Sequence, residues 1–298
     1  MDTLSASGLA LRVRAAWWQF LGMKVADTGV GLRDLLVHRK RCVLVPTMGA
    51  LHRGHMELVK RARQSAGPDG IVVVSIFVNP IQFDRKGDLD AYPRPLEDDL
   101  AKCEAAGVDV VFTPEAASMY HADRSVTVTE SLLSGGLCGA ARPGHFDGVC
   151  TVVLKLFLLC GCDAAVFGEK DFQQLAVIRR MVRDLDVPVE ILECPTVRES
   201  DGLAMSSRNV RLNAAQREDA PRIHRSLLEA ARETQADHIL AVARRGIEAS
   251  AMARIDYLAL VDAENLQPVS DLKRPAVLAA AVFYGEVRLI DHVTLNAR

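Results

Sequence analysis

Short apolar runs alternate with helix-like stretches over the first two-thirds of this chain. The apolar runs are rich in β-branched residues, which is typical of buried strands. They span residues 41–46, 71–78, 108–112, 164–167 and 189–193. Helical patterns fill the intervals at residues 55–64, 96–106, 148–160 and 172–185. Because strand and helix alternate, the sequence predicts right-handed βαβ crossovers and a parallel sheet.

The pattern changes in the last third of the chain. A long helical stretch is expected over residues 213–232, and another over residues 236–251. Three apolar segments follow as predicted strands, at residues 255–261, 276–282 and 286–295. Gly285 is placed to turn the last two. This part of the sequence predicts a smaller α/β unit with an antiparallel sheet.

These patterns divide the chain into three parts. We expect a larger domain over residues 23–197 and a smaller one over residues 198–298, preceded by an N-terminal extension at residues 1–22. The apolar run in that extension contains Gln19 and is far too short to span a bilayer. Met23 is a candidate for the true start of the folded protein.

Composition narrows the class of protein. Of the 298 residues, 49% are hydrophobic, which supports a sizeable core. The formal net charge of −2 gives no global basic field, so we expect neither nucleic acid nor membrane as a partner. The seven cysteines are odd in number and scattered, which argues against a disulfide framework. A reduced, cytoplasmic setting fits best.

The segment VLVPTMGALHRGH, residues 43–55, carries the clearest chemistry. An apolar strand ends at Pro46, a loop containing glycine follows, and two histidines, His52 and His55, stand at the start of a helix. Loop N–H groups and the positive end of a helix dipole favour phosphate. The segment therefore predicts a phosphate site with two imidazoles beside it. The ordinary alternative is a capped helix start whose histidines face solvent.

Three more polar motifs follow predicted strands, and each has an ordinary alternative. Asn79 and Gln82 offer amides that suit a hydroxy acid, or they form a simple turn. Residues 168–171 offer glycine, ammonium and carboxylates, or a solvated helix cap. Residues 205–208 end in Arg208, whose guanidinium could bind phosphate; the alternative is that this segment is only a polar linker. Strand ends of a parallel sheet share one crevice, so we expect all these motifs to meet there.

Two acidic residues at a predicted helix start have two possible roles. Asp98 and Asp99 stand where the helix dipole favours carboxylates in any protein. They also suit Mg²⁺ bound to a nucleotide, which needs only one or two protein carboxylates. We keep both as candidate magnesium ligands. The turn ARPGHFDGV, residues 141–149, adds a cation before another helix, where it could contact an anion or simply begin the helix.

Taken together and in order, five segments resemble the pantoate–β-alanine ligase family of the HIGH-motif nucleotidyltransferase superfamily. They are PTMGALHRGH (46–55), VSIFVNPIQF (74–83), ARPGHFDGV (141–149), FGEKDFQQL (167–175) and DGLAMSSRN (201–209). The resemblance runs from about residue 30 to the C-terminus. It implies a Rossmann-like domain that binds ATP and pantoate, with the smaller domain as a lid. It also implies a homodimer and the use of Mg²⁺.

The resemblance implies a two-step reaction. ATP and pantoate give pantoyl adenylate and pyrophosphate, and β-alanine then displaces AMP to give pantothenate. By motif position, His55, His52, Lys170 and Arg208 are the catalytic candidates, with His55 at the position of a proton donor and a source of positive charge. Gln82 is expected to contact pantoate and β-alanine, while Gln174 and Asn79 are expected to contact pantoate. The apolar side chains of Phe77, Val149 and Val152 are expected to surround the methyl groups of pantoate.

The ATP contacts that the resemblance implies form one set. They are Met48, Gly49, Ala50, Leu51, His52, Arg53, Gly54, His55, Gly168, Glu169, Lys170, Asp171, Val197, Met205, Ser206, Ser207 and Arg208. Two rival functions remain. One is another HIGH-type adenylyl transferase, which the paired glutamines argue against; the other is a nucleotide-binding or RNA-associated module, which the near-neutral charge argues against.

Overall fold

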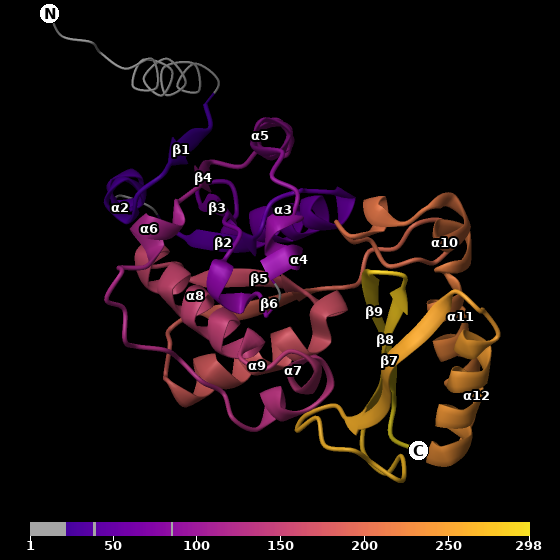
Figure 1. Ribbon diagram of the computed structural model, residues 1–298. Coiled ribbons are helices and arrows are strands. Elements are labelled where there is room, and N and C mark those ends of the chain that lie inside the picture. Colours follow the sequence, from indigo (N-terminus) through magenta and orange to yellow (C-terminus); the bar gives the residue numbers. More distant parts are fainter. Residues whose placement is uncertain (1–21, 38–39, 85) are drawn as a thin grey trace, which may run out of the picture.

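The computed structural model describes residues 22–37, 40–84 and 86–298, and Figure 1 shows their arrangement. The extension expected at residues 1–22 therefore lies outside the described residues, apart from Gly22. Two sheets organise the described chain. No helix in these ranges is long and apolar enough to cross a bilayer.

The first sheet has six parallel strands, in the order β1-β4-β3-β2-β5-β6. Their bounds are β1 Lys24–Ala26, β2 Cys42–Thr47, β3 Ile71–Ile76, β4 Val110–Phe112, β5 Ala164–Gly168 and β6 Glu190–Cys194. The predicted parallel sheet of Rossmann-like type is confirmed. Strand β1 was not predicted, because three residues carry too little pattern and the strand depends on its pairing with β4.

Helices cover both faces of this sheet. They are α2 Gly29–Leu36, α3 Arg53–Ala66, α5 Leu96–Ala105, α8 His145–Cys160 and α9 Phe172–Asp184. Successive strand residues point to opposite faces. Leu44 therefore packs in one cluster with α2, α8 and α9, while Val43 and Val45 pack in the other with α3 and α5. Because both faces are covered, the strands are continuous apolar runs rather than alternating ones.

Strand order reverses between β2 and β5. From β2 the chain proceeds outward through β3 to β4, and it then crosses back so that β5 lies against the other side of β2. In open parallel sheets the crevice for a ligand lies beyond the carboxyl ends of the strands at such a reversal. The loops after β2 and β5 are the ones that the sequence marks with residues 48–55 and 168–171.

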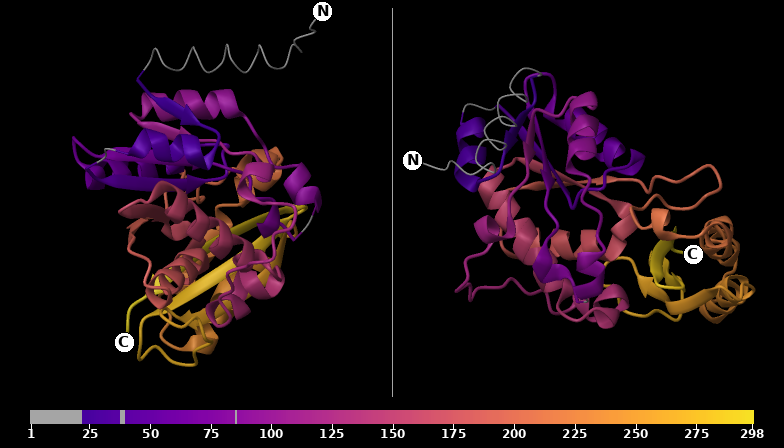
Figure 2. Two further views of the ribbon diagram at one scale, coloured as in Figure 1. Left: turned by 90° about the vertical axis from the view of Figure 1, so that its left-hand side faces the viewer. Right: turned by 45° about the horizontal axis from the view of Figure 1, so that its top comes forward.

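The second sheet consists of three antiparallel strands in the order β7-β8-β9. Their bounds are β7 Ala253–Asp262, β8 Ala276–Tyr284 and β9 Val287–Leu295. The predicted antiparallel sheet is confirmed, and Gly285 lies in the turn at a φ of 58°. One face of β8 packs on α11 and α12, while Val277 and Ala279 on the other face belong to the same apolar cluster as α9 (Figures 1 and 2).

The single helix predicted over residues 213–232 is wrong. The chain forms α10 at Ala214–Asp219 and α11 at Arg222–Ala230, with Pro221 between them. Proline has no N–H and obstructs the preceding turn, so the helix cannot continue through it. The next helix, α12 at Ala236–Glu248, agrees with the prediction apart from its end.

Short elements complete the described chain, and several of them border the crevice. They are η1 Pro80–Gln82, α4 Lys86–Asp90, α6 Ala116–Met119, η2 Leu133–Gly135, α7 Leu137–Ala141, η3 Glu169–Asp171 and η4 Asn209–Arg211. The seven cysteines all fall within the described residues, and no disulfide joins any of them there.

Candidate active site

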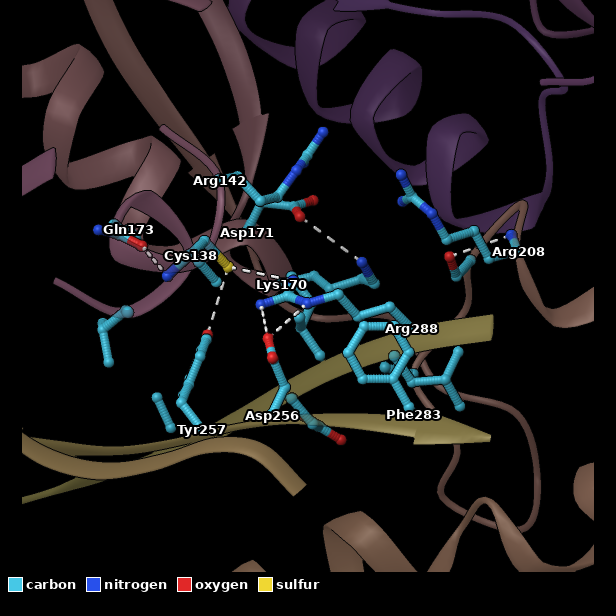
Figure 3. A pocket seen from close by; sticks show the side chains of 18 of the residues that line it. Cys138, Arg142, Lys170, Asp171, Gln173, Arg208, Asp256, Tyr257, Phe283 and Arg288 are labelled. Carbon is cyan, nitrogen blue, oxygen red and sulfur yellow. Dashed lines mark hydrogen bonds and ion pairs between the residues drawn. The ribbon is translucent and has the colours of Figure 1, made fainter. Parts of the chain in front are cut away.

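Two adjoining cavities lie beyond the carboxyl ends of the parallel strands. The first, about 240 Å³, is bounded by residues that follow β2, β3 and β5, together with residues 205–208. The second, about 420 Å³, lies between the two sheets and is shown in Figure 3. Arg142, Lys170, Asp171 and Arg208 line both cavities. Figure 3 shows these four residues above the side chains of the second sheet.

Most residues predicted for the site do line the first cavity. They are Met48, His52, Gly54, His55, Asn79, Gln82, Gly168, Lys170, Asp171, Gln174, Val197, Met205, Ser206, Ser207 and Arg208. The expected apolar wall of Phe77, Val149 and Val152 lines it as well. Seven predicted residues do not line it: Gly49, Ala50, Leu51, Arg53, Asp98, Asp99 and Glu169.

The two histidines form a reciprocal cap at the start of α3. His52 is the N-cap residue, and its Nδ1 accepts a hydrogen bond from the N–H of Gly54 at 3.1 Å. Nδ1 of His55 accepts one from the N–H of His52 at 3.2 Å. Since a backbone N–H can only donate, both Nδ1 atoms are unprotonated. Each neutral ring therefore carries its hydrogen on Nε2, where it is available as a donor.

Both imidazoles are held neutral at pH 7. Burial lowers the pKa of His52 to about 4, with further lowering by the charges of Lys170 and Lys102. Burial likewise lowers the pKa of His55 to about 3, assisted by His52 and Lys170. The sequence suggested that His55 supplies positive charge, and in the free protein this is wrong. Each ring instead offers a neutral Nε2–H donor to an anion.

The loop between β2 and α3 uses its amide hydrogens internally. The N–H of Gly49 bonds to Oγ1 of Thr47 at 3.2 Å, while those of Ala50 and Leu51 bond to the carboxylate of Asp99 at 2.8 and 2.7 Å. Those of His52 and Gly54 belong to the reciprocal cap. Our prediction that loop N–H groups bind phosphate is therefore not supported for these five positions. The loop supports the imidazoles instead.

The two candidate magnesium ligands are engaged elsewhere. Both carboxylate oxygens of Asp99 accept the loop hydrogen bonds, and Asp99 is 1% exposed. Asp98 Oδ2 lies 2.6 Å from the Nζ of Lys102. An ammonium therefore stands beside the pair where the sequence suggested a divalent cation. These residues do not fit the predicted metal site.

Gln82 is held at the cavity by Asn79. Nδ2 of Asn79 donates to Oε1 of Gln82 at 2.9 Å and to the carbonyl of Gly148 at 3.1 Å, and Oδ1 accepts from the hydroxyl of Tyr120 at 2.8 Å. Both amide hydrogens of Asn79 are thus used within the protein, and the residue is 1% exposed. The structure favours a positioning role for Asn79 over the direct pantoate contact that we expected.

The two adjacent glutamines of α9 have different roles. Gln173 is buried, donates to the carbonyls of Leu133 and Gly136 at 2.9 and 2.7 Å, and accepts from the N–H of Cys138 at 2.9 Å. It holds η2 and α7 in place. Gln174, which the sequence singled out, lines both cavities.

Positive charge at the site comes from three long side chains. Lys170 is 3.6 Å from Asp171, Arg208 is 3.4 Å from Asp88, and Arg142 pairs with Asp84 at 2.8 Å. Burial opposes ionisation of Asp171, but the charges of Lys170 and Arg208 outweigh it and lower the pKa of the carboxyl. Lys170 and Arg208 thus stand beside the imidazoles with only partial neutralisation.

Sequence reasoning missed several side chains that line the first cavity, among them His145 and Tyr92. His145 bonds through Nδ1 to the carbonyl of Gln82 at 2.8 Å, and burial lowers its pKa to about 4. It lies inside the ARPGHFDGV motif, so the motif could have indicated it. Tyr92 has its hydroxyl 3.4 Å from Oγ of Ser207, and no local pattern marks it.

Arg53 connects the start of α3 to the second sheet. Its guanidinium donates to the carbonyl of Arg198 at 2.7 Å. Arg198 in turn forms two bonds with Asp291 of β9, at 2.7 and 2.9 Å. Arg53 therefore turns away from the cavity, where we had placed it with the ATP contacts.

Comparison with known proteins gives one consistent result. The model of a family described as pantoate-beta-alanine ligase matches residues 24–294. A pantothenate synthetase of Akkermansia muciniphila is 54% identical over 285 residues, covering 92% of this chain and 100% of that one. A pantothenate synthetase of a Chelativorans species is 51% identical over 257 residues, covering 85% and 89%.

Solved structures agree with the sequence relatives. Pantothenate synthetase from Thermus thermophilus superposes with a TM-score of 0.86 at 45% identity, covering 91% of this chain and 99% of that one. Pantoate-beta-alanine ligase from Francisella tularensis, whose crystal structure is complexed with beta-gamma ATP and beta-alanine, superposes with a TM-score of 0.75 at 32% identity. It covers 91% of this chain and 97% of that one.

Proposed function

The chain belongs to the pantoate–β-alanine ligase family, and we propose that it makes pantothenate through an enzyme-bound pantoyl adenylate. The observation that carries this proposal is the meeting of three groups at one cavity. Neutral imidazole donors follow β2, the cations Lys170 and Arg208 flank them, and the paired amides Gln82 and Gln174 complete the wall. Groups that can bind phosphate are thus adjacent to groups that can bind a hydroxy acid.

In the first step the carboxylate of pantoate attacks the α-phosphorus of ATP. A carboxylate–phosphorus bond forms, the bond to the bridging oxygen breaks, and pyrophosphate leaves with the electron pair. Charge builds on the leaving group, so fixed donors there lower the barrier. We assign that role to the Nε2–H groups of His52 and His55 and to the charges of Lys170 and Arg208. No covalent enzyme intermediate is needed.

Pantoate is small, with a gem-dimethyl group beside two hydroxyls and a carboxylate. We place its methyls against Phe77, Val149 and Val152, which are buried along one wall. Gln82, held by Asn79, and Gln174 then hold the hydroxyls and carboxylate. A mostly apolar pocket with a few fixed polar groups is what such a ligand requires.

In the second step the neutral amine of β-alanine attacks the carbonyl carbon of the adenylate. The C–N bond forms, the bond from carbon to the AMP oxygen breaks, and the nitrogen loses a proton to water. Premature hydrolysis competes with this attack, so water must be kept from the mixed anhydride. We propose that the smaller domain, residues 198–298, acts as a lid for that purpose. The contacts from Arg53 through Arg198 to Asp291 connect it to the histidine loop.

Magnesium is proposed to enter as the complex with ATP, where it neutralises phosphate charge. Among the described residues that line the first cavity, Asp171 is the only acidic one. Asp98 and Asp99 do not line this cavity, so Asp171 fits a metal–nucleotide complex better than either of them does. Asp171 is therefore the residue to which we assign this contact.

We further propose a homodimer in the cytoplasm. Val30 and Val37 of the α2 region and Leu158 of α8 are each more than 60% exposed, and α2 packs against α8. Exposed apolar side chains over neighbouring helices suit an interface between copies. Sedimentation equilibrium of the purified protein tests the dimer, and a monomer at micromolar concentration would refute it.

The seven cysteines, which form no disulfide within the described chain, fit the reducing compartment that we propose.

One experiment tests the reaction directly. Labelled pyrophosphate should exchange into ATP only when pantoate is present, because exchange requires reversible adenylate formation. Addition of β-alanine should then give pantothenate and AMP in equal amounts. Exchange that needs no pantoate, or that only a nucleotide supports, would contradict the proposal.

A further inference from the structure

Helix α5 holds the loop that carries the histidines. Asp99 accepts the N–H groups of Ala50 and Leu51 at 2.8 and 2.7 Å, and Nζ of Lys102 donates to the carbonyl of Leu51 at 2.8 Å. Leu51 is thus fixed at both its N–H and its C=O. All these contacts come from side chains one turn apart on a single helix.

The loop needs such support because its backbone is unusual. Ala50 has a φ of +50°, in the left-handed region that residues with a Cβ rarely adopt. Gly49 has a φ of +82°, and a Cβ there would lie 2.9 Å from Oδ2 of Asp99. Conformations of this kind persist only when neighbouring groups enforce them. Asp99 and Lys102 are the groups that do so here.

Lys102 stands where a bound cation was expected. Its ammonium contacts Oδ2 of Asp98 at 2.6 Å and the Leu51 carbonyl at 2.8 Å. We propose that Asp99 and Lys102 are positioning residues for adenylate formation, with the Lys102 ammonium as a built-in cation in place of magnesium at this point. The inference rests on the proposed function, since the loop matters through the two imidazoles that follow it.

The charge of Lys102 also reaches the imidazoles. The groups that face His52 and His55 are Lys102 of α5 together with Lys170 and Asp171 of η3. The two lysines lower the pKa of both rings and Asp171 raises it, in addition to the main effect of burial. Because each Nδ1 must stay unprotonated to accept its cap hydrogen bond, removal of the Lys102 charge makes the cap more sensitive to acid.

The test compares four variants of the full chain in pantoate-dependent pyrophosphate exchange. Lys102→Met removes the charge, Lys102→Arg restores it, and Asp99→Asn preserves shape while presenting an NH₂ to one loop N–H. Lys60→Met is the matched control, because Lys60 is an exposed lysine on α3 whose ion pair is with the nearby Glu57. Thermal unfolding confirms that each variant is folded.

We expect Lys102→Met and Asp99→Asn to slow pantoate-dependent exchange about tenfold at saturating ATP and pantoate, with smaller changes in the two KM values, because misplaced imidazole donors lose their alignment with the leaving group. Lys102→Arg should recover most of the loss. The acid limb of the pH profile, and the imidazole pKa values followed by nitrogen NMR, should move to higher pH in Lys102→Met and stay fixed in Lys60→Met.

Two results would overturn the inference while leaving the proposed function intact. One is a wild-type enzyme with pantoate-dependent exchange whose Lys102→Met and Asp99→Asn variants match Lys60→Met in every measurement. The other is paramagnetic broadening, by Mn²⁺ alone, of the amide signals of Asp98 and Lys102 in the wild-type protein. A wild-type protein without pantoate-dependent exchange would instead refute the proposed function, and this inference with it.

Discussion

Nδ2 of Asn79 donates a hydrogen bond to Oε1 of Gln82 over 2.9 Å, so one buried amide fixes the orientation of another at the cavity wall. Asn79→Ala should therefore raise KM for pantoate about tenfold while KM for ATP changes little. The substitution also leaves the carbonyl of Gly148 and the hydroxyl of Tyr120 without their partner, which costs about 1–3 kcal/mol of stability.

A double-mutant cycle separates positioning from direct contact. If Asn79 acts through Gln82, the effect of Asn79→Ala on pantoate binding should largely disappear in a Gln82→Ala background. Isothermal titration calorimetry with pantoate supplies the four affinities. Fully additive losses would contradict the positioning role and favour a separate contact between Asn79 and pantoate.

The Nε2–H groups of the histidines should act on chemistry rather than on folding. His55→Ala should slow single-turnover adenylate formation about 100- to 1,000-fold, as expected when a fixed donor to developing charge is removed. His52→Ser is the sharper variant, because serine keeps the N-cap while losing the Nε2–H donor. It should retain stability and lose adenylation; a normal rate of adenylate formation would refute the assigned role of His52.

The buried histidines predict loss of stability in acid. The pKa values of His52, His55 and His145 are lowered from the ordinary 6.5 to about 4, 3 and 4. Between these pKa values the unfolded chain binds protons that the folded chain does not bind. The free energy of unfolding is therefore unaffected by these histidines above pH 6.5 and falls as the pH drops toward 4. Thermal unfolding between about pH 7.5 and pH 4.5 measures the decline.

A pair of variants identifies the source of that decline. His145→Gln should make the melting temperature fall less steeply with acid, because it removes one of the buried imidazoles whose pKa is lowered by folding. His238→Gln, which changes an exposed histidine on α12, is the control and should follow the wild-type curve. Equal slopes in all three proteins would show that carboxylates, and not His145, dominate acid unfolding.

Gly148 allows α8 to approach η1 closely. A Cβ at this position would lie 2.5 Å from the carbonyl oxygen of Ile81 and 2.7 Å from the nitrogen of Gln82. Gly148→Ala should destabilise the fold by about 1–3 kcal/mol and displace Gln82, which weakens pantoate binding. Gly135→Ala is the matched control, since its Cβ would meet no atom within 4 Å. Denaturant unfolding compares the two, and equal stability would contradict the close-packing account.

The sequence by itself determined every strand except β1, together with most of the main helices and the motifs. Apolar runs such as residues 71–78 are continuous because both faces of a parallel sheet are covered, and that requirement is visible in the residues alone. Motifs placed after β2, β3, β5 and β6 predicted a shared crevice, because parallel strands end on the same side of the sheet. The break at Pro221 was also available locally, and our prediction overlooked it.

Tertiary structure alone decided what the polar groups do. The carboxylate of Asp99 and the loop amides it binds are 48 and 49 residues apart, and Asn79 reaches the carbonyl of Gly148 across 69. No local pattern states which buried donor meets which acceptor, because that depends on how distant elements pack. The histidine motif predicted the presence of two imidazoles. Only the folded chain showed that both rings are neutral, that each Nδ1 accepts a hydrogen bond in the cap of α3, and that α5 supports the loop before them.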